Sequence, residues 1–226
     1  MTTSAVIWDM DGVIADTARY HFSSWQELAR ENGVPFTEED FRRGFGRRNP
    51  EILREFLGKQ PSSDEIQTLS KRKEELFRRL IDGRVVAFPG ALALLRALSL
   101  LSRVKQALAT STPIENVDLI LGTLRIAGCF ESVVADKDVA RGKPDPQAFL
   151  LAAERLKVPP ASCVVIEDAV DGVKAARSAN MKCIAVTNTH PGERLGEADL
   201  VVDSLAKVSV ETIRNLLRQG GRQWTR

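Results

Sequence analysis

Six short runs of apolar residues recur along the chain, and each has the length of a buried β-strand rather than that of a helix. Between most of them, apolar residues return every three or four positions, which is the period of an amphipathic helix. Buried strands that alternate with helices predict an α/β fold, in which helices cover both faces of a parallel sheet. The predicted strands are 5–8, 104–109, 133–135, 163–166, 183–186 and 200–202, and the clearest helices are 91–101, 146–156 and 172–179.

A gap of about 90 residues separates the first two predicted strands, far more than a usual crossover connection. The stretch 17–82 is rich in helix-forming and charged residues, and its apolar positions have helical spacing. We therefore predict a sheet core made of 1–16 and 83–226, and a small α-helical cap, 17–82, over the edge where the first strand ends. Joints that allow the cap to move are expected near 15–18 and 83–89, where glycine and proline interrupt the pattern.

The composition excludes several classes of protein. Of 226 residues, 43% are hydrophobic and 27% charged, and no apolar run approaches the roughly 20 residues that a membrane span needs. The first residues become charged too early for a secretory signal, so we predict a cytoplasmic protein. A net charge of +2, with basic residues spread among acidic ones, argues against a nucleic-acid partner. The three cysteines show no CxxC spacing, which gives a disulfide framework or a zinc site little support. The closing segment, 220–226, is expected to be frayed.

Acidic residues follow two of the predicted strands. Asp9 and Asp11 come directly after the first strand, and Glu167 and Asp168 follow the fourth. Ligands of open α/β sheets bind at these carboxyl ends, although an Asp-x-Asp-Gly segment can also be an ordinary turn. If the two strands are neighbours, three or four carboxylates converge without a histidine or a thiolate, which predicts an oxygen-ligand site for a hard cation such as Mg²⁺. Without a cation, the mutual repulsion of these carboxylates would cost several kcal/mol.

Two further segments fit phosphate chemistry. Thr110, Ser111 and Thr112 follow the second predicted strand, and their hydroxyl and backbone N–H groups could hold phosphoryl oxygens, especially if a helix begins at Pro113. Hydroxyl runs that only cap a helix are also common. Lys143 lies in a proline-containing turn before another predicted helix. A loop lysine is usually solvated, but beside the carboxylates it would offset charge on a nucleophile and on a phosphate.

Taken in order, these pieces resemble the motif set of the haloacid dehalogenase superfamily: Asp9-x-Asp11-Gly12, then Thr110, Lys143-Pro144 and Glu167-Asp168. The resemblance spans nearly the whole chain, and the helical insertion lies where that superfamily carries its cap. One Asp-x-Asp is weak evidence, whereas four motifs on successive predicted strand ends are strong evidence. The resemblance implies a Rossmann-like core, a mobile helical cap and a required Mg²⁺.

The resemblance also implies a role for each matching residue. Asp9 would attack phosphorus and form an aspartyl-phosphate. Asp11 would be the general acid for the leaving oxygen and then the base for the incoming nucleophile. Asp9, the backbone carbonyl of Asp11 and Asp168 would ligate Mg²⁺, with Glu167 as a further ligand or a partner of the ligands. The phosphoryl group would be held by Thr110, by Lys143 and by the backbone of Ser111.

The longer segment 9–25, DMDGVIADTARYHFSSW, is similar to β-phosphoglucomutases and to the sugar-phosphate phosphatases grouped with them. By that similarity, His21 would help to set Asp11 when the cap closes, and Lys73 would face the substrate. The alternative interpretations are an exposed helix histidine and an ordinary surface lysine. Asp171 is expected either to add an acid near the metal or to cap the helix that follows it.

Two departures from the mutase pattern bear on the reaction. The mutases keep a cap arginine for the second phosphate, and that position is Asn49 here, although Arg47 or Arg48 could substitute. Pro113 and Ile114 stand where the mutases have polar residues. Both departures favour transfer of the phosphoryl group to water.

We therefore predict a Mg²⁺-dependent phosphatase of small phosphorylated metabolites, with sugar phosphates as the expected substrates. β-Phosphoglucomutase activity is the alternative, and a non-catalytic scaffold that kept the fold for partner binding is a remote one. A scaffold would be free to lose Asp9, Asp11, Lys143 or Asp168, yet all four are present. The protein is expected to be a monomer or a weak homodimer, with neither nucleic acid nor membrane as a partner.

Overall fold

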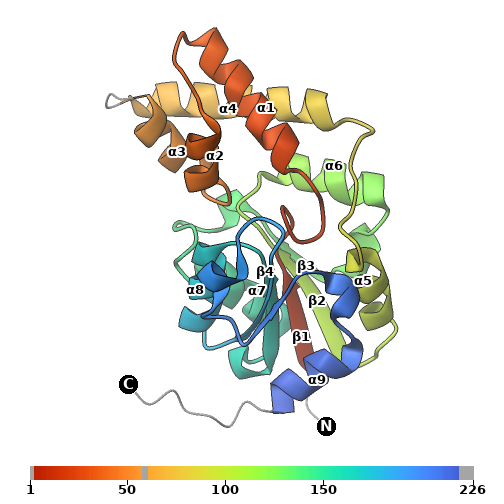
Figure 1. Cartoon of the computed structure of the whole chain (residues 1–226). Coiled ribbons are helices and arrows are strands. Elements are labelled where there is room, and N and C mark those ends of the chain that lie inside the picture. The colour runs from red at the N-terminus through yellow and green to blue at the C-terminus, as the bar shows by residue number, and fades with distance from the viewer. Residues whose placement is uncertain (1–2, 58–60, 219–226) are drawn as a thin grey trace.

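The computed structural model describes residues 3–57 and 61–218, and six parallel strands form one sheet at its centre (Figure 1). The strand order is β3-β2-β1-β4-β5-β6, so β1 lies between β2 and β4. All six predicted strands are present, with ends shifted by at most one residue, and the predicted α/β class is confirmed. The strands are β1 Ser4–Trp8, β2 Val104–Ala109, β3 Ser132–Val134, β4 Cys163–Glu167, β5 Lys182–Val186 and β6 Leu200–Val202. The segment 220–226, expected to be frayed, lies outside the described residues.

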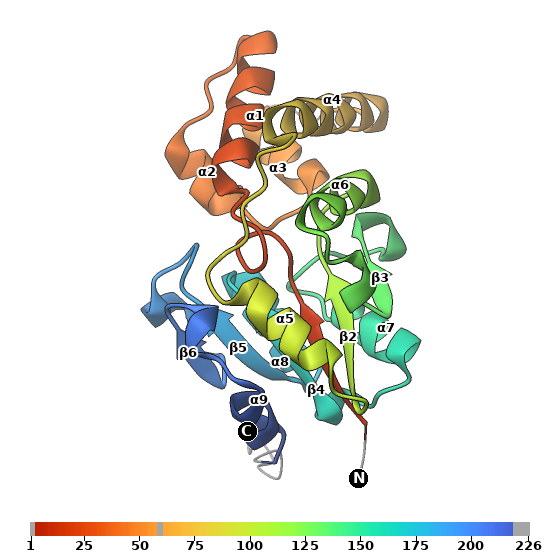
Figure 2. The same cartoon turned by 90° about the vertical axis from the view of Figure 1, so that its right-hand side faces the viewer.

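Helices cover both faces of the sheet because successive strand residues point to opposite sides. Val6 and Trp8 of β1 belong to the hydrophobic core on one face, whereas Ala5 and Ile7 belong to the core on the other. The first face is covered by α5 (Ala91–Ser99), α6 (Ile114–Leu124) and α9 (Val210–Arg218), and the second by α7 (Gln147–Leu156) and α8 (Val170–Ser178) (Figure 2). Among the described residues, no helix has the length and apolar character that crossing a membrane requires.

Four helices lie between β1 and α5 and pack over the carboxyl ends of the strands (Figure 1). They have a hydrophobic core of their own, in which Trp25, Leu28 and Leu53 are almost completely buried. Polar residues fix the beginnings of two of them: the Thr37 hydroxyl accepts a hydrogen bond from the backbone N–H of Asp40, and the Ser62 hydroxyl accepts one from the backbone N–H of Glu65. The helices are α1 Ala18–Glu31, α2 Glu38–Gly44, α3 Asn49–Phe56 and α4 Ser63–Ile81.

The two connections between these helices and the sheet run side by side. Ala15 and Ala87 form an antiparallel bridge. The backbone N–H of Asp16 donates to Val86 (2.9 Å), and that of Phe88 donates to Ile14 (2.9 Å). These pairs lie at the two segments that the sequence predicts as joints, so a movement of the helices about them would be a movement of both connections together.

Candidate active site

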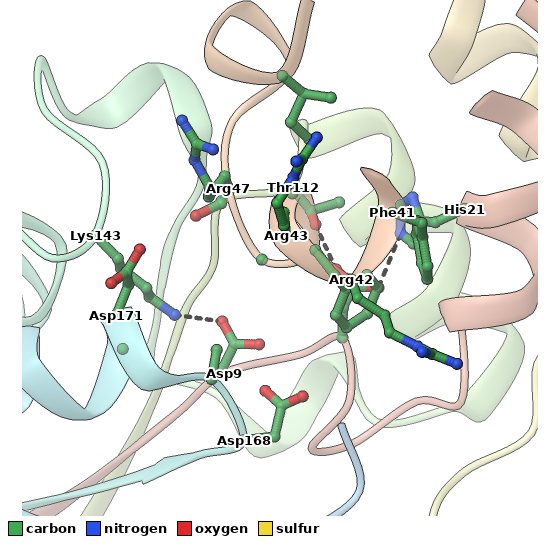
Figure 3. Close-up of a pocket in the computed structure, with 18 of the residues that line it drawn as sticks. Asp9, His21, Phe41, Arg42, Arg43, Arg47, Thr112, Lys143, Asp168 and Asp171 are labelled. Carbon is green, nitrogen blue, oxygen red and sulfur yellow. Dashed lines mark hydrogen bonds and ion pairs between the residues drawn. The ribbon is translucent and has the colours of Figure 1, made fainter. Parts of the chain in front are cut away.

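The chain changes direction across the sheet at β1, because β2 and β3 lie on one side of it and β4 to β6 on the other. Such a reversal opens a crevice at the carboxyl ends of the strands, where ligands of α/β proteins bind. Trp8 at the end of β1 pairs with Ile166 of β4, which brings Asp9 and Asp168 together. Figure 3 shows the two carboxylates next to each other, with that of Asp9 directed toward Lys143. They line a cavity of about 520 Å³ between the sheet and the helices α1 to α4.

Lys143 forms ion pairs with both Asp9 and Glu167. Its Nζ lies 2.6 Å from Oδ1 of Asp9 and 2.5 Å from Oε1 of Glu167, and all three side chains are buried. Burial opposes the charge of Lys143, but Asp9 and Glu167 outweigh it and raise the pKa of the ammonium. Burial raises the pKa of Asp9 to about 7, with Lys143 opposing the rise and the charges of Glu167 and Asp11 adding to it. One ammonium therefore compensates only part of the negative charge gathered here.

The remaining charge fits a hard cation. Asp168 is almost completely buried, and burial, Glu167 and Asp9 together raise its pKa well above the usual value. Its Oδ2 accepts a hydrogen bond from the Thr189 hydroxyl. Two neighbouring carboxylates, with no nitrogen or sulfur ligand beside them, are the kind of ligand that Mg²⁺ prefers. The part of the chain that the structure describes contains no cluster of three or more Asp, Glu, His or Cys side chains arranged for a metal. The backbone carbonyl of Asp11 remains the third ligand that the family resemblance implies.

Both carboxylate oxygens of Glu167 are engaged by donors of the protein. Its Oε1 accepts from Lys143, and its Oε2 accepts from the backbone N–H groups of Asp168 (2.7 Å) and Ala169 (2.8 Å). In this arrangement Glu167 orients Lys143 and the turn after β4. Of the two roles that the sequence left open, the geometry favours partner of the ligands over ligand.

Asp11 is held by three donors. The hydroxyls of Thr17 and Thr112 lie 2.5 Å from its Oδ1 and Oδ2, and Nε2 of His21 lies 3.3 Å from Oδ1. Burial opposes ionisation, but the His21 interaction and the two hydroxyls outweigh it and lower the pKa of Asp11 to about 2. Sequence reasoning missed Thr17 and Thr112 as partners of Asp11. The only signal was that Thr112 belongs to the hydroxyl run after β2.

His21 and Lys73 lie inside the cap rather than on its surface, so both surface interpretations are wrong. His21 is 9% exposed and Lys73 is 2% exposed. Nζ of Lys73 lies 2.7 Å from Nδ1 of His21 and 2.9 Å from Oε1 of Glu74. Burial and the Lys73 charge lower the pKa of His21, which makes the neutral ring the main form at neutral pH. Because Nδ1 faces an ammonium, the ring proton lies on Nε2 and is donated to Asp11.

The cap residues considered for a second phosphate have other partners. Nδ2 of Asn49 donates to Glu74 (2.7 Å). Arg47 lines the cavity and forms ion pairs with Glu51 (3.4 Å) and Glu55 (2.9 Å). Arg48 instead donates to backbone carbonyls of the core, those of residues 136 (3.0 Å) and 140 (3.2 Å). Arg48 therefore ties the cap to the loop that leads to Lys143.

The other predicted phosphate contacts line the cavity. Thr110 is buried, and its hydroxyl accepts a hydrogen bond from the backbone N–H of Thr112 (3.3 Å), while Ser111 is half-buried beside it. Asp171 also lines the cavity. The idea that Asp171 caps the following helix is wrong, because α8 begins one residue before it and Ala169 holds the cap position. Asp171 lies in the first turn, where a negative charge suits the helix dipole.

Gly12 sets how closely the β1 loop approaches Asp168. Its φ is +84°, and a Cβ at this position would overlap Oδ2 of Asp168. We expect Gly12→Ala to lower the free energy of unfolding by about 2–5 kcal/mol, from left-handed strain and overpacking together. Gly33→Ala is the matched control, because Gly33 has φ +67° with open space around it and should lose only about 1–2 kcal/mol. Urea unfolding measures the free energy of unfolding of both variants. Equal losses would mean that the Asp168 side chain moves aside from the new Cβ at no cost in free energy.

Known proteins resemble this chain over nearly its full length. Residues 3–180 match the haloacid dehalogenase-like hydrolase family. The chain belongs to this family. The phosphorylated carbohydrates phosphatase of Thermotoga maritima is 36% identical over 217 residues, which cover 95% of this chain and 98% of that protein. The β-phosphoglucomutase of Bacillus subtilis is 38% identical over 216 residues, with 92% and 93% covered. A crystal structure of β-phosphoglucomutase from Clostridium difficile superposes with a TM-score of 0.87 at 31% identity, covering 96% of this chain and 98% of that one.

Membership in the haloacid dehalogenase-like family confirms the resemblance drawn from the four motifs. The similar members include a phosphatase and mutases, so the chain is a phosphoryl-transfer enzyme, either a phosphohydrolase or a mutase. Members of this family generally use Mg²⁺, which agrees with the oxygen-only character of the Asp9 and Asp168 pair.

Proposed function

We propose that this enzyme hydrolyses small phosphorylated metabolites, in particular sugar phosphates, through an aspartyl-phosphate on Asp9. The observation that carries the proposal is the position of Asp9. It lies just after the carboxyl end of β1, with Lys143 on one of its oxygens and Asp168 beside it. A carboxylate that lies in a cavity and is paired with a fixed cation is suited to attack phosphorus, because the cation offsets charge that the two reactants bring together.

The protein residues divide the chemistry between them. Asp9 supplies the attacking oxygen, and Lys143 offsets negative charge on Asp9 and on the incoming phosphoryl group. Asp11 gives a proton to the leaving oxygen when Asp9 attacks phosphorus, and it takes one back from water when the aspartyl-phosphate is hydrolysed. The ionised Asp11, held by Thr17, Thr112 and His21, is the form that takes the proton. Mg²⁺ held by Asp9, Asp168 and the carbonyl of Asp11 would neutralise charge on the phosphoryl oxygens.

Hydrolysis is favoured over mutase chemistry by the partners of the cap residues. A mutase must hold a bisphosphate that turns around, which calls for a cation opposite the reacting phosphate. Asn49 is neutral and engaged with Glu74, Arg48 is engaged with the core, and Arg47 is offset by two acids. β-Phosphoglucomutase activity is the second candidate, supported by the 38% identity to the Bacillus subtilis mutase.

Phosphate release from a panel of sugar phosphates, with Mg²⁺ and with a chelator, tests the proposal. We expect release with Mg²⁺, a fall of at least about 100-fold with chelator, and recovery when Mg²⁺ is restored. β-Glucose 1-phosphate with a trace of the bisphosphate is run in parallel. Formation of glucose 6-phosphate without phosphate release would show that the enzyme is a mutase, whereas chelator-insensitive release would contradict the metal site.

A further inference from the structure

A buried carboxylate that the mechanism does not use lies behind His21. Glu74 of α4 is 5% exposed, yet it is ionised, because Lys73, His21 and Asn49 outweigh the effect of burial and lower its pKa. Its Oε1 accepts from Lys73 (2.9 Å) and Asn49 (2.7 Å), and its Oε2 accepts from Nδ2 of Asn116 (2.5 Å). Three donors on one buried carboxylate make a polar cluster that is fully engaged, which fixes the position of each member.

One of the three donors belongs to the core rather than to the cap. Asn116 lies in the first turn of α6, is completely buried, and reaches Glu74 of α4 across the boundary between the two units. Its Oδ1 accepts from Arg78 of α4 (2.8 Å), so both ends of the amide are used. Figure 2 shows α4 above α6 at this boundary. The cluster therefore forms completely only when α4 is seated against α6.

Through Lys73 and His21, the cluster is also connected to Asp11, the general acid and base of the proposed reaction. Lys73 connects Glu74 to His21, and His21 reaches Asp11 (3.3 Å). The surroundings of Lys73 are otherwise aromatic, since its Nζ lies 5.2 Å from the ring centre of Phe77. Without Glu74, a buried ammonium would lose its only carboxylate partner among the described residues, and such a charge is too costly to stay in place. The position of Lys73 against His21 thus depends on Glu74.

We propose that Glu74 is a positioning residue that couples the seating of the cap on Asn116 to the orientation of His21 against Asp11. The proposal rests on the proposed function, in which Asp11 protonates the leaving oxygen. It makes proton transfer to the leaving group conditional on contact between α4 and α6. Attack by Asp9 on phosphorus does not pass through this cluster, although Lys73 and Glu74 also line the cavity.

The test compares two leaving groups in Glu74→Gln, which keeps the shape and removes the charge. A sugar phosphate leaves as an alkoxide that needs a proton, whereas p-nitrophenyl phosphate leaves as a stable phenolate that does not. The ratio kcat/KM reports steps up to the first phosphoryl transfer, so the later hydrolysis does not enter. We expect kcat/KM to fall about 10- to 100-fold for the sugar phosphate and less than about 3-fold for p-nitrophenyl phosphate. Equal losses for both substrates, or no loss for either, would overturn the proposal.

Two further variants separate a positioning role from a folding defect. Glu75→Gln is the matched control, because Glu75 is the next residue of α4 but is 42% exposed and pairs only loosely with Arg72 (3.7 Å); it should change neither substrate. Asn116→Asp approaches the cluster from the core by placing a second carboxylate against Glu74, and should reproduce the selective loss. Thermal unfolding of each variant confirms that the protein used in the assay is folded.

A measurement without substrate keeps this inference distinct from the proposed function. The chain has two histidines, so a His190→Gln background leaves the imidazole of His21 as the only one in a ¹H–¹⁵N spectrum. We expect the Nε2–H tautomer in that background and in its Glu75→Gln derivative, and a mixture of tautomers with Glu74→Gln. An unchanged His21 spectrum with Glu74→Gln would overturn the positioning role, whereas failure of wild type to hydrolyse any sugar phosphate would contradict the proposed function alone.

Discussion

Replacing Asp9 by asparagine is expected to lower phosphate release to background, a loss on the order of 10⁴- to 10⁶-fold. The amide has nearly the shape of the carboxylate but lacks the negative oxygen that attacks phosphorus. Lys143 keeps Glu167 as a partner at 2.5 Å, so the ion pair behind the nucleophile survives. The measurement is Mg²⁺-dependent phosphate release from the best sugar phosphate of the panel, at saturating substrate and in single-turnover form.

Stability provides the control for Asp9→Asn. Burial and neighbouring carboxylates already oppose ionisation of Asp9 and raise its pKa to about 7. Removing that charge should therefore leave the free energy of unfolding unchanged or slightly higher without metal. A folded variant without turnover would support Asp9 as the nucleophile, and a folded variant that keeps its turnover would mean that another group attacks the phosphate.

The fold could be predicted from the sequence because its signals are local. Strands such as Cys163–Glu167 are short and apolar throughout, as expected for strands buried on both faces. The helix α9, Val210–Arg218, is absent from the prediction, although Val210, Ile213, Leu216 and Leu217 recur at helical spacing. The predicted start of α8 is two residues late because Asp171 is a typical N-cap residue, whereas the observed cap position is held by Ala169, which makes no side-chain cap.

The acids of the candidate site could be predicted because strand order brings successive strand ends together. Nothing local indicates that Thr17 reaches Asp11, or that Glu74 meets Asn116 across 42 positions of the chain. These contacts depend on how the helical insertion sits on the sheet, and a lone threonine, glutamate or asparagine on a helix is usually solvated. Lys73 illustrates the same limit: Lys71 and Arg72 before it are exposed or half-buried, yet its own side chain is 2% exposed between two aromatic rings.

Replacing Lys143 by methionine is expected to lower the free energy of unfolding by about 3–5 kcal/mol in the absence of Mg²⁺. Methionine fills most of the volume against Phe149 but leaves Asp9 and Glu167 buried without their cation. Phosphate release should also fall by about 100-fold or more, because the charge beside the transferring phosphoryl group is lost. Urea unfolding and the sugar-phosphate assay measure the two effects on the same preparation.

Two variants decide whether the loss comes from the uncompensated carboxylate. Lys137→Met is the control, because Lys137 is exposed in the turn that follows β3. It should change the free energy of unfolding by no more than about 0.5 kcal/mol and leave turnover nearly unchanged. The double variant Lys143→Met with Glu167→Gln removes one buried negative charge together with the cation, so it should recover part of the stability but none of the activity. Recovery of stability without activity would mean that Lys143 has two separable roles: it compensates Glu167 in the folded protein, and it neutralises Asp9 and the phosphate during transfer. If the double variant is as unstable as Lys143→Met alone, the loss of stability comes from the uncompensated Asp9 rather than from Glu167.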